Sequence, residues 1–185
     1  MKTSLQSLAI ATAIALTSAM APAYAASNPT VGGAPMLVTK DIVDNAATSK
    51  DHTTLVAAVK AAGLVETLKG PGPFTVFAPT NAAFSALPAG TVDTLLKPES
   101  KATLTKVLTY HVVPGKVDAA SLIAKIKAGG GSATLTTVQG EPLTAKLNGK
   151  KVTLTDAKGN TATVTIADVN QSNGVIHVID KVLMP

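Results

Sequence analysis

The chain of 185 residues contains no cysteine, no tryptophan and no arginine, and only 3% of its residues are aromatic. The lack of cysteine excludes disulfides, a thiolate nucleophile and cysteine-based zinc sites. The lack of arginine removes the side chain that most often binds phosphate or guanine through two parallel hydrogen bonds. The two Tyr and three Phe cannot form an extended stacking platform for bases. These absences argue against a nucleic-acid-binding protein, although the net charge is +5.

The first 25 residues have the features of an export signal. Lys2 precedes an apolar stretch over residues 8–21, which is followed by Ala-Tyr-Ala. A membrane-spanning helix needs about 20 apolar residues, more than this stretch provides. We therefore predict cleavage after Ala25, a secreted or periplasmic protein, and no membrane span. Residues 26–36 are polar and rich in glycine and proline, which predicts a flexible leader before a single domain over residues 37–185.

The pattern of apolar residues indicates helices first and strands later. Apolar positions recur at helical spacing over residues 51–62, whereas residues 74–78 and 110–113 have the composition of strands. Over residues 143–166, apolar residues alternate with Thr and Lys, and an Asn-Gly turn interrupts the alternation. Such alternation predicts an antiparallel meander with one buried face and one solvent-facing face. The fold class is therefore predicted to be α+β, with mostly antiparallel strands and helices packed along them.

Tyr110 and His111 form the dipeptide most suggestive of chemistry. A general acid–base pair would explain it, and so would contact with a partner. In a strand, however, adjacent side chains point to opposite faces, so the two groups would not meet at one substrate atom. We favour a structural role, in which one ring fills the core and the other group bonds to backbone. His177 lies in a nearly continuous apolar run and is interpreted as a buried histidine with satisfied hydrogen bonds.

Lysine is unevenly distributed along the chain. Residues 116–160 contain 7 Lys and 3 acidic residues, whereas residues 26–115 contain 7 Lys and 6 acidic residues. The excess includes a basic surface on the predicted meander, formed by Lys146, Lys150 and Lys151. This surface could attract an acidic polysaccharide or protein. The simpler explanation is that exposed lysines oppose edge-to-edge aggregation of strands.

Motifs typical of enzymes and of phosphate or metal sites do not occur in the sequence. It has no Gly-x-Ser-x-Gly elbow, no phosphate-binding loop, no His-Glu-x-x-His and no EF-hand pattern. The three histidines are far apart, and none lies at ligand spacing from another. We therefore predict no catalytic residue, no cofactor and no metal, and we expect a monomer.

Three blocks of the sequence resemble the fasciclin I domain family. The first is Phe74-Thr-Val-Phe-Ala-Pro-Thr-Asn-Ala-Ala-Phe84, and the second is Leu108-Thr-Tyr-His-Val-Val-Pro-Gly-Lys116. The third is Asn173-Gly-Val-Ile-His-Val-Ile-Asp-Lys-Val-Leu-Met-Pro185. The chain is most similar in plan to the small secreted single-domain bacterial members, which include mycobacterial immunogenic proteins.

The resemblance implies a β-sandwich or wedge with helices along it, in a non-catalytic adhesion or interaction module at the cell surface or matrix. It places candidate partner-binding residues at Tyr110 and His111, and a third at Asp168, where Asp-Val stands in place of the Asp-Ile of animal members. The implied partner is a protein or polysaccharide. Two alternatives remain open at this point: a carrier of a small ligand or lipid, suggested by the aliphatic composition, and an envelope enzyme that uses Tyr110 or His111.

Overall fold

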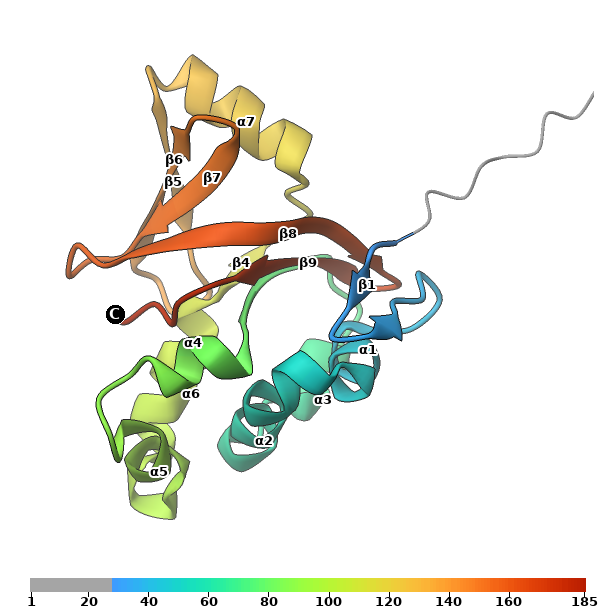
Figure 1. The fold of residues 1–185 in the computed structure, drawn as a ribbon, viewed down its shortest axis with the longest axis vertical. Helices are drawn as coiled ribbons and strands as arrows, with labels where there is room; N and C mark the ends of the chain where they lie inside the picture. The colour runs from blue at the N-terminus through green and yellow to red at the C-terminus, as the bar shows by residue number, and fades with distance from the viewer. Residues whose placement is uncertain (1–27) are drawn as a thin grey trace, which may run out of the picture.

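The computed structural model describes residues 28–185, so the predicted signal sequence and its cleavage point lie outside the described residues. Helices dominate the first half, and a twisted sheet of seven strands occupies the second half and the centre (Figure 1). All but one of the strand pairs in this sheet are antiparallel, since only β3 and β9 run parallel. The predicted α+β class is thus confirmed.

The strands of the large sheet lie in the order β4-β3-β9-β8-β7-β6-β5. Their bounds are β3 Phe74–Pro79, β4 Val112–Pro114, β5 Ser132–Thr136, β6 Pro142–Asn148, β7 Lys151–Thr155, β8 Thr161–Gln171 and β9 Gly174–Ile179. The predicted meander corresponds to β6, β7 and β8, and its register pairs apolar residues with apolar residues across every strand boundary. Period-two alternation therefore located this part of the fold correctly.

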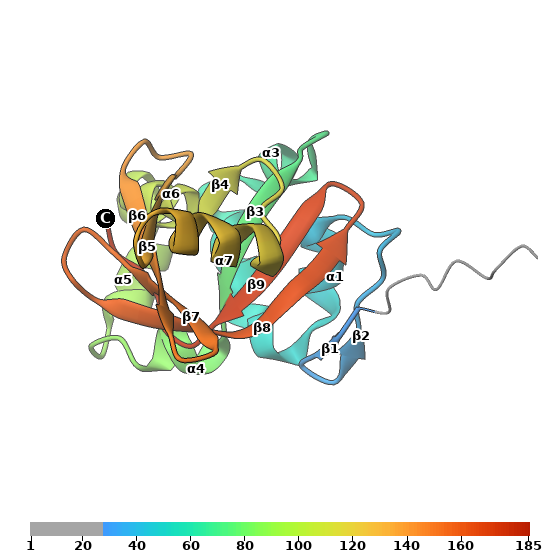
Figure 2. The same ribbon diagram turned by 90° about the horizontal axis from the view of Figure 1, so that it is seen from above.

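The helices are short, and several begin at a residue whose side chain caps them. Their bounds are α1 Ile42–Thr48, α2 Thr53–Ala62, α3 Val65–Lys69, α4 Asn81–Ser85, α5 Thr91–Leu96, α6 Lys101–Tyr110 and α7 Ala119–Ala128, with 3-10 turns η1 Lys50–His52 and η2 Pro98–Ser100. The carboxylates of Asp41 and Asp118 and the hydroxyl of Thr80 each accept a backbone N–H of the helix that follows. Seen from above, α7 lies across β5 to β7, and α1 lies near the far end of β8 (Figure 2).

Two apolar clusters form the core, and β3 and β9 lie between them. The first cluster joins α1 to α6 with one face of these strands, through Val76 and Ile176 among others. The second joins α7 and the meander with the opposite face, through Phe77 and Ile179. Every residue of β9 is buried, as its nearly continuous apolar run predicted.

The segment predicted to be a flexible leader, residues 26–36, is packed onto the domain where the structure describes it. It forms a hairpin of β1 Thr30–Val31 and β2 Ala34–Pro35, and Val31 is buried in the first cluster. Gly32 has φ +58, and a Cβ there would lie 2.5 Å from the Ser49 hydroxyl oxygen. Only glycine fits so close an approach, so the hairpin tip rests directly on η1.

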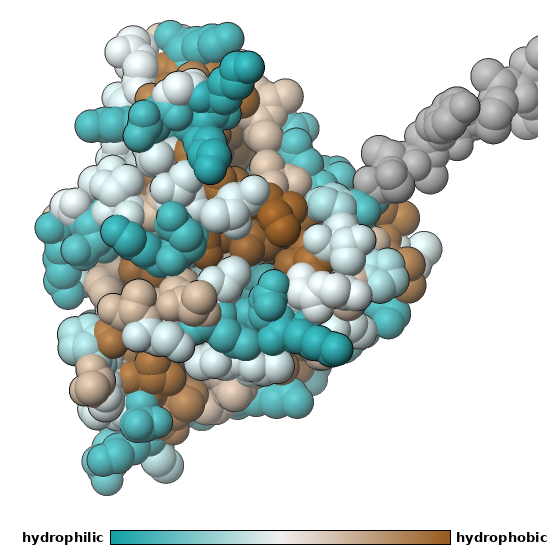
Figure 3. Space-filling model, in the orientation of Figure 1, coloured by the Kyte–Doolittle hydropathy of each residue, from teal (hydrophilic) through white to brown (hydrophobic). Residues whose placement is uncertain are grey.

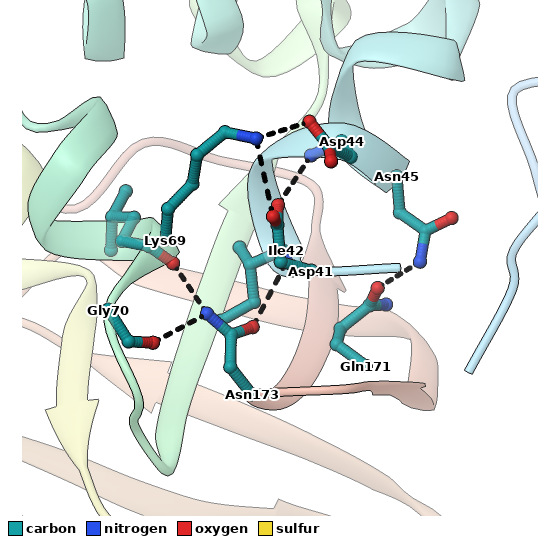
Figure 4. A network of polar contacts seen from close by, with 9 residues as sticks. Asp41, Ile42, Asp44, Asn45, Lys69, Gly70, Gln171 and Asn173 are labelled. Carbon is teal, nitrogen blue, oxygen red and sulfur yellow. Dashed lines mark hydrogen bonds and ion pairs between the residues drawn. The ribbon is translucent and has the colours of Figure 1, made fainter. Parts of the chain in front are cut away.

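The turn between β8 and β9 ties two helices to the sheet through Asn173 (Figure 4). Its side-chain oxygen accepts the N–H of Ile42 at 3.1 Å, and its side-chain nitrogen donates to the carbonyls of Leu68 at 2.7 Å and Gly70 at 3.0 Å. One amide thus satisfies backbone groups at the start of α1 and the end of α3. The same view shows Lys69 paired with two carboxylates at the start of α1, in an exposed position.

Candidate functional site

Tyr110 and His111 lie at the end of α6, and the prediction that a strand begins at Tyr110 is wrong. Tyr110 is the last residue of the helix, and the N–H of His111 donates to the carbonyl of Leu108 at 3.1 Å. The helical spacing of Leu104 and Leu108 outweighs the strand preference of the residues that follow, so β4 begins only at Val112. Tyr110 consequently enters the second apolar cluster, while His111 lies against the first.

His111 is 3% exposed, and both of its ring nitrogens bond to backbone. Nδ1 lies 2.8 Å from the carbonyl of Val107, and Nε2 accepts the N–H of Leu183 at 3.0 Å. A carbonyl can only accept, so the ring is neutral with its proton on Nδ1. Burial lowers the pKa of His111 to about 4. No nitrogen remains for proton transfer to a substrate.

Tyr110 is 0% exposed and connects α6 with the meander. Its hydroxyl donates to the carbonyl of Pro142 at 3.0 Å and accepts the N–H of Ala157 at 3.1 Å. Burial raises the pKa of this hydroxyl. Both hydrogen-bonding functions of the hydroxyl are therefore used inside the protein, at the entry to β6 and at the turn after β7.

Asp168 holds the start of α7. It occupies an irregularity of β8 with φ 57, a left-handed conformation that Asp tolerates better than most residues. One carboxylate oxygen accepts the N–H of Ala119 at 2.7 Å. The N–H of Asp168 donates to Nδ1 of His177 at 3.3 Å, and Nε2 of His177 donates to the carbonyl of Val117 at 2.8 Å. His177 is buried with both ring nitrogens bonded, which confirms the interpretation of a buried, satisfied histidine, and burial lowers its pKa.

The structure does not bring Tyr110, His111 and Asp168 together as a surface for a partner. Tyr110 and His111 are buried, so a partner outside the protein cannot contact them directly. Asp168 is half-buried and already bonded to α7. Each of the three residues instead connects backbone segments that are distant in sequence, which is a structural role. Asn173 has the same connecting role, and its place at the start of the third resembling block is the one signal of it in the sequence.

Polar side chains instead gather on the solvent side of the meander, and hydrophilic side chains are prominent over the upper part of the molecule, where α7 and the meander lie (Figure 3). Two rows of register-paired residues run across β5, β6, β7 and β8, opposite to the face that α7 covers (Figure 1). We call these rows, together with the lysines of the β6–β7 turn, the hydroxyl–lysine face. Its members are Ser132, Thr134, Thr144, Lys146, Lys150, Lys151, Thr153, Thr155, Thr161 and Thr163. The three lysines predicted as a basic surface are all exposed.

The interior offers little room for a ligand. Two small apolar cavities, of about 20 Å³ and 30 Å³, lie between the helices and β3. The larger hollows are open surface clefts, of about 610 Å³ beside Leu87 and Met184 and about 770 Å³ beside Asn28 and Asp168. A single water molecule needs about 10 to 15 Å³ on this measure, so the smaller of the two apolar cavities has space for one or two waters and the larger for two or three. Among residues 28–185 there is also no group of three or more His, Asp or Glu side chains placed to hold a metal ion. No helix in this range has the length and apolar character needed to cross a bilayer.

The three blocks of sequence that resemble the fasciclin I family meet in the centre of the sheet. They contribute β3, β4 and β9, and β3 lies between the other two. A family model described as the fasciclin domain matches residues 50–185. The chain belongs to the fasciclin domain family. The resemblance drawn from the sequence is thus confirmed.

Bacterial relatives of this fasciclin protein span most of its length. Protein sll1483 of Synechocystis sp. is 56% identical over 144 residues, covering 78% of this chain and 73% of that protein. Immunogenic protein MPB70 of Mycobacterium bovis is 39% identical over 168 residues, covering 88% of this chain and 78% of that protein. Cell surface glycolipoprotein MPB83 of the same species is 38% identical over 168 residues, covering 88% and 69%.

The fold also matches a solved fasciclin structure. This is a FAS1 domain pair from the insect cell adhesion molecule Fasciclin I, with a TM-score of 0.70 at 17% sequence identity. The match covers 83% of this chain and 52% of the insect chain, so the described domain corresponds to about half of that structure. At this identity, the similarity establishes the fold and confirms the predicted wedge with helices along it.

Proposed function

We propose that this fasciclin domain is an exported, non-catalytic adhesion module that binds its partner through its exposed surface, in particular through the hydroxyl–lysine face. The observation that supports this most strongly is the use of both His111 nitrogens and of the Tyr110 hydroxyl by backbone groups. The groups best suited to acid–base chemistry are therefore already engaged in hydrogen bonds that stabilise the fold. Export rests on the signal features of residues 1–25, and surface adhesion is consistent with the names of the mycobacterial and insect relatives.

The alternative of a small-ligand or lipid carrier is not favoured. A carrier encloses most of its ligand in a pocket of several hundred cubic ångströms. The two small apolar cavities of the described domain hold at most a few water molecules. The larger hollows, of about 610 Å³ and 770 Å³, are open surface clefts with a mixed polar and apolar lining, which do not enclose a lipid.

The proposal is tested with purified protein and envelope fractions from the organism that produces it. We expect saturable binding that weakens as salt is raised, because exposed lysines are screened at high ionic strength. Lys146→Glu/Lys150→Glu/Lys151→Glu should bind more weakly than Lys60→Glu/Lys97→Glu/Lys106→Glu, which has the same net charge but alters exposed lysines of the helical half. Absence of saturable binding, or equal binding by the two triple variants, would contradict the proposal.

A further inference from the structure

The hydroxyl–lysine face has a regular arrangement that the strand register fixes. Thr134, Thr144, Thr155 and Thr161 pair in sequence across β5, β6, β7 and β8. The neighbouring row consists of Ser132, Lys146, Thr153 and Thr163. Paired residues stand about 5 Å apart between strands, and the rows are separated by about 7 Å along each strand. The face therefore presents hydrogen-bonding groups on a fixed two-dimensional lattice.

Several hydroxyls of this lattice are free for an external partner. Within residues 28–185, the hydroxyls of Thr134, Thr144 and Thr163 make no hydrogen bond to another residue. Thr153 is the most covered member, at 8% exposed, and its hydroxyl donates to the carbonyl of Lys146. Thr155 and Thr161 contact each other at 3.4 Å. Hydroxyls without a protein partner therefore lie on both sides of the hydroxyls that bond within the protein, where a ligand can bind them.

The charge of the face is positive. Lys146 stands within its row, Lys150 and Lys151 lie beside that row at the β6–β7 turn, and all three are exposed. No position in either row is acidic. Asp180 lies at the β8 end of the Lys146 row, where its carboxylate accepts the N–H of Thr163. Asp156, at the β7–β8 turn, is buried outside the two rows, where its carboxylate accepts backbone and side-chain N–H groups. An anionic ligand is therefore favoured beside the three lysines.

The absence of apolar side chains on the face decides between classes of partner. The energetic centre of a protein–protein interface is usually a cluster of aromatic or large apolar residues. The two rows contain only Ser, Thr and Lys, and their apolar neighbours in each strand face the core. Nucleic acid is disfavoured because the chain has neither arginine nor aromatic residues on these strands. A flexible chain of hydroxyls and carboxylates is complementary to such a surface.

We propose that the hydroxyl–lysine face binds an acidic polysaccharide that lies across β5 to β8, with carboxylates at Lys146, Lys150 and Lys151 and sugar hydroxyls at the threonine rows. This inference rests on the proposed function and names the partner class for the same surface. The lysines attract the carboxylates electrostatically, as they would attract any polyanion. The threonine rows add hydrogen bonds to sugar hydroxyls, which a polyanion without hydroxyls cannot form.

The test uses polygalacturonate as the acidic polysaccharide, dextran as a neutral one and polyphosphate as a polyanion without sugar. Binding is measured by titration calorimetry with the full protein. We expect binding to polygalacturonate, none to dextran, and weaker binding to polyphosphate. Lys146→Glu/Lys150→Glu/Lys151→Glu should weaken binding at least about tenfold, whereas Lys60→Glu/Lys97→Glu/Lys106→Glu should lose less than about threefold.

A second variant separates the lattice from simple charge attraction. Thr134→Val/Thr144→Val/Thr163→Val removes three hydroxyls and keeps β-branched side chains, so the sheet should be retained. We expect about fivefold weaker binding to polygalacturonate and unchanged binding to polyphosphate. Equal affinity of this variant and the wild type, or equal wild-type affinity for both polyanions, would overturn the inference in favour of nonspecific charge attraction. If envelope binding persists and depends on the three lysines while polygalacturonate does not bind, the polysaccharide inference fails but the proposed function stands.

Discussion

The buried polar residues and the exposed meander of this protein differ in how their hydrogen bonds are used. Tyr110, His111 and His177 are typical catalytic residue types, yet each is enclosed and bonded to backbone from distant segments. The hydroxyl–lysine face consists of common surface residues, yet it leaves hydroxyls and ammonium groups unused. Residue type alone therefore points to the enclosed residues, whereas the hydrogen bonds left unused point to the exposed face that we propose as the binding surface.

The difference between the buried region and the exposed face should be largest when His111 is substituted. His111→Ala leaves the carbonyl of Val107 and the N–H of Leu183 without partners and opens a cavity between α6 and the C-terminal segment. We expect a loss of about 3 to 5 kcal/mol in the free energy of unfolding, measured by urea titration. Lys151→Ala, on the exposed face, should change it by less than about 0.5 kcal/mol. Similar values for the two variants would remove the distinction between the regions.

Lowering the pH should destabilise the folded protein through its buried histidines. Burial lowers the pKa of His52, His111 and His177 in the folded protein, that of His111 to about 4. Between pH 6.5 and 4 the unfolded chain binds protons that the folded chain does not, so stability is fully present above pH 6.5 and falls as the pH decreases. The His111 contribution is about 3 kcal/mol by pH 4. Thermal unfolding followed across this range should show the decline, and a stability that stayed constant would contradict neutral, buried histidines.

Asn173 tests whether one side-chain amide joins the helices to the sheet. Asn173→Asp keeps an acceptor for the N–H of Ile42 but loses the donors to the carbonyls of Leu68 and Gly70. We expect a loss of about 2 to 3 kcal/mol in stability. Hydrogen exchange should quicken in α1 and α3, and an effect confined to the β8–β9 turn would argue against the connecting role.

Among these variants of the buried region, Tyr110→Phe should cause the smallest loss in the free energy of unfolding. The ring stays in the second cluster, while Pro142 and Ala157 lose their shared hydroxyl partner. The expected cost is about 1 to 2 kcal/mol, measured by urea titration. A cost near that of His111→Ala would mean that the hydroxyl anchors the meander more strongly than its two hydrogen bonds indicate.

Sequence patterns predicted those parts of the fold that depend on neighbouring residues. The alternation over residues 143–166 located the meander and its solvent-facing face, and the family blocks located β3 and β9. The packed hairpin at residues 30–35 was missed because its polar sequence reveals nothing about the contact of Gly32 with η1. The burial of Tyr110 was foreseen as one possibility, but the pairing of its hydroxyl with Pro142 and Ala157 depends on long-range packing.

The most direct measurement compares the affinity of two variants for envelope fractions under the same conditions. Tyr110→Phe alters the enclosed region, and Lys146→Glu/Lys150→Glu/Lys151→Glu alters the exposed face. We predict that Tyr110→Phe binds as the wild type does and that the lysine variant loses at least about tenfold in affinity. The reverse result, with binding lost in Tyr110→Phe and kept in the lysine variant, would contradict a binding surface on the meander.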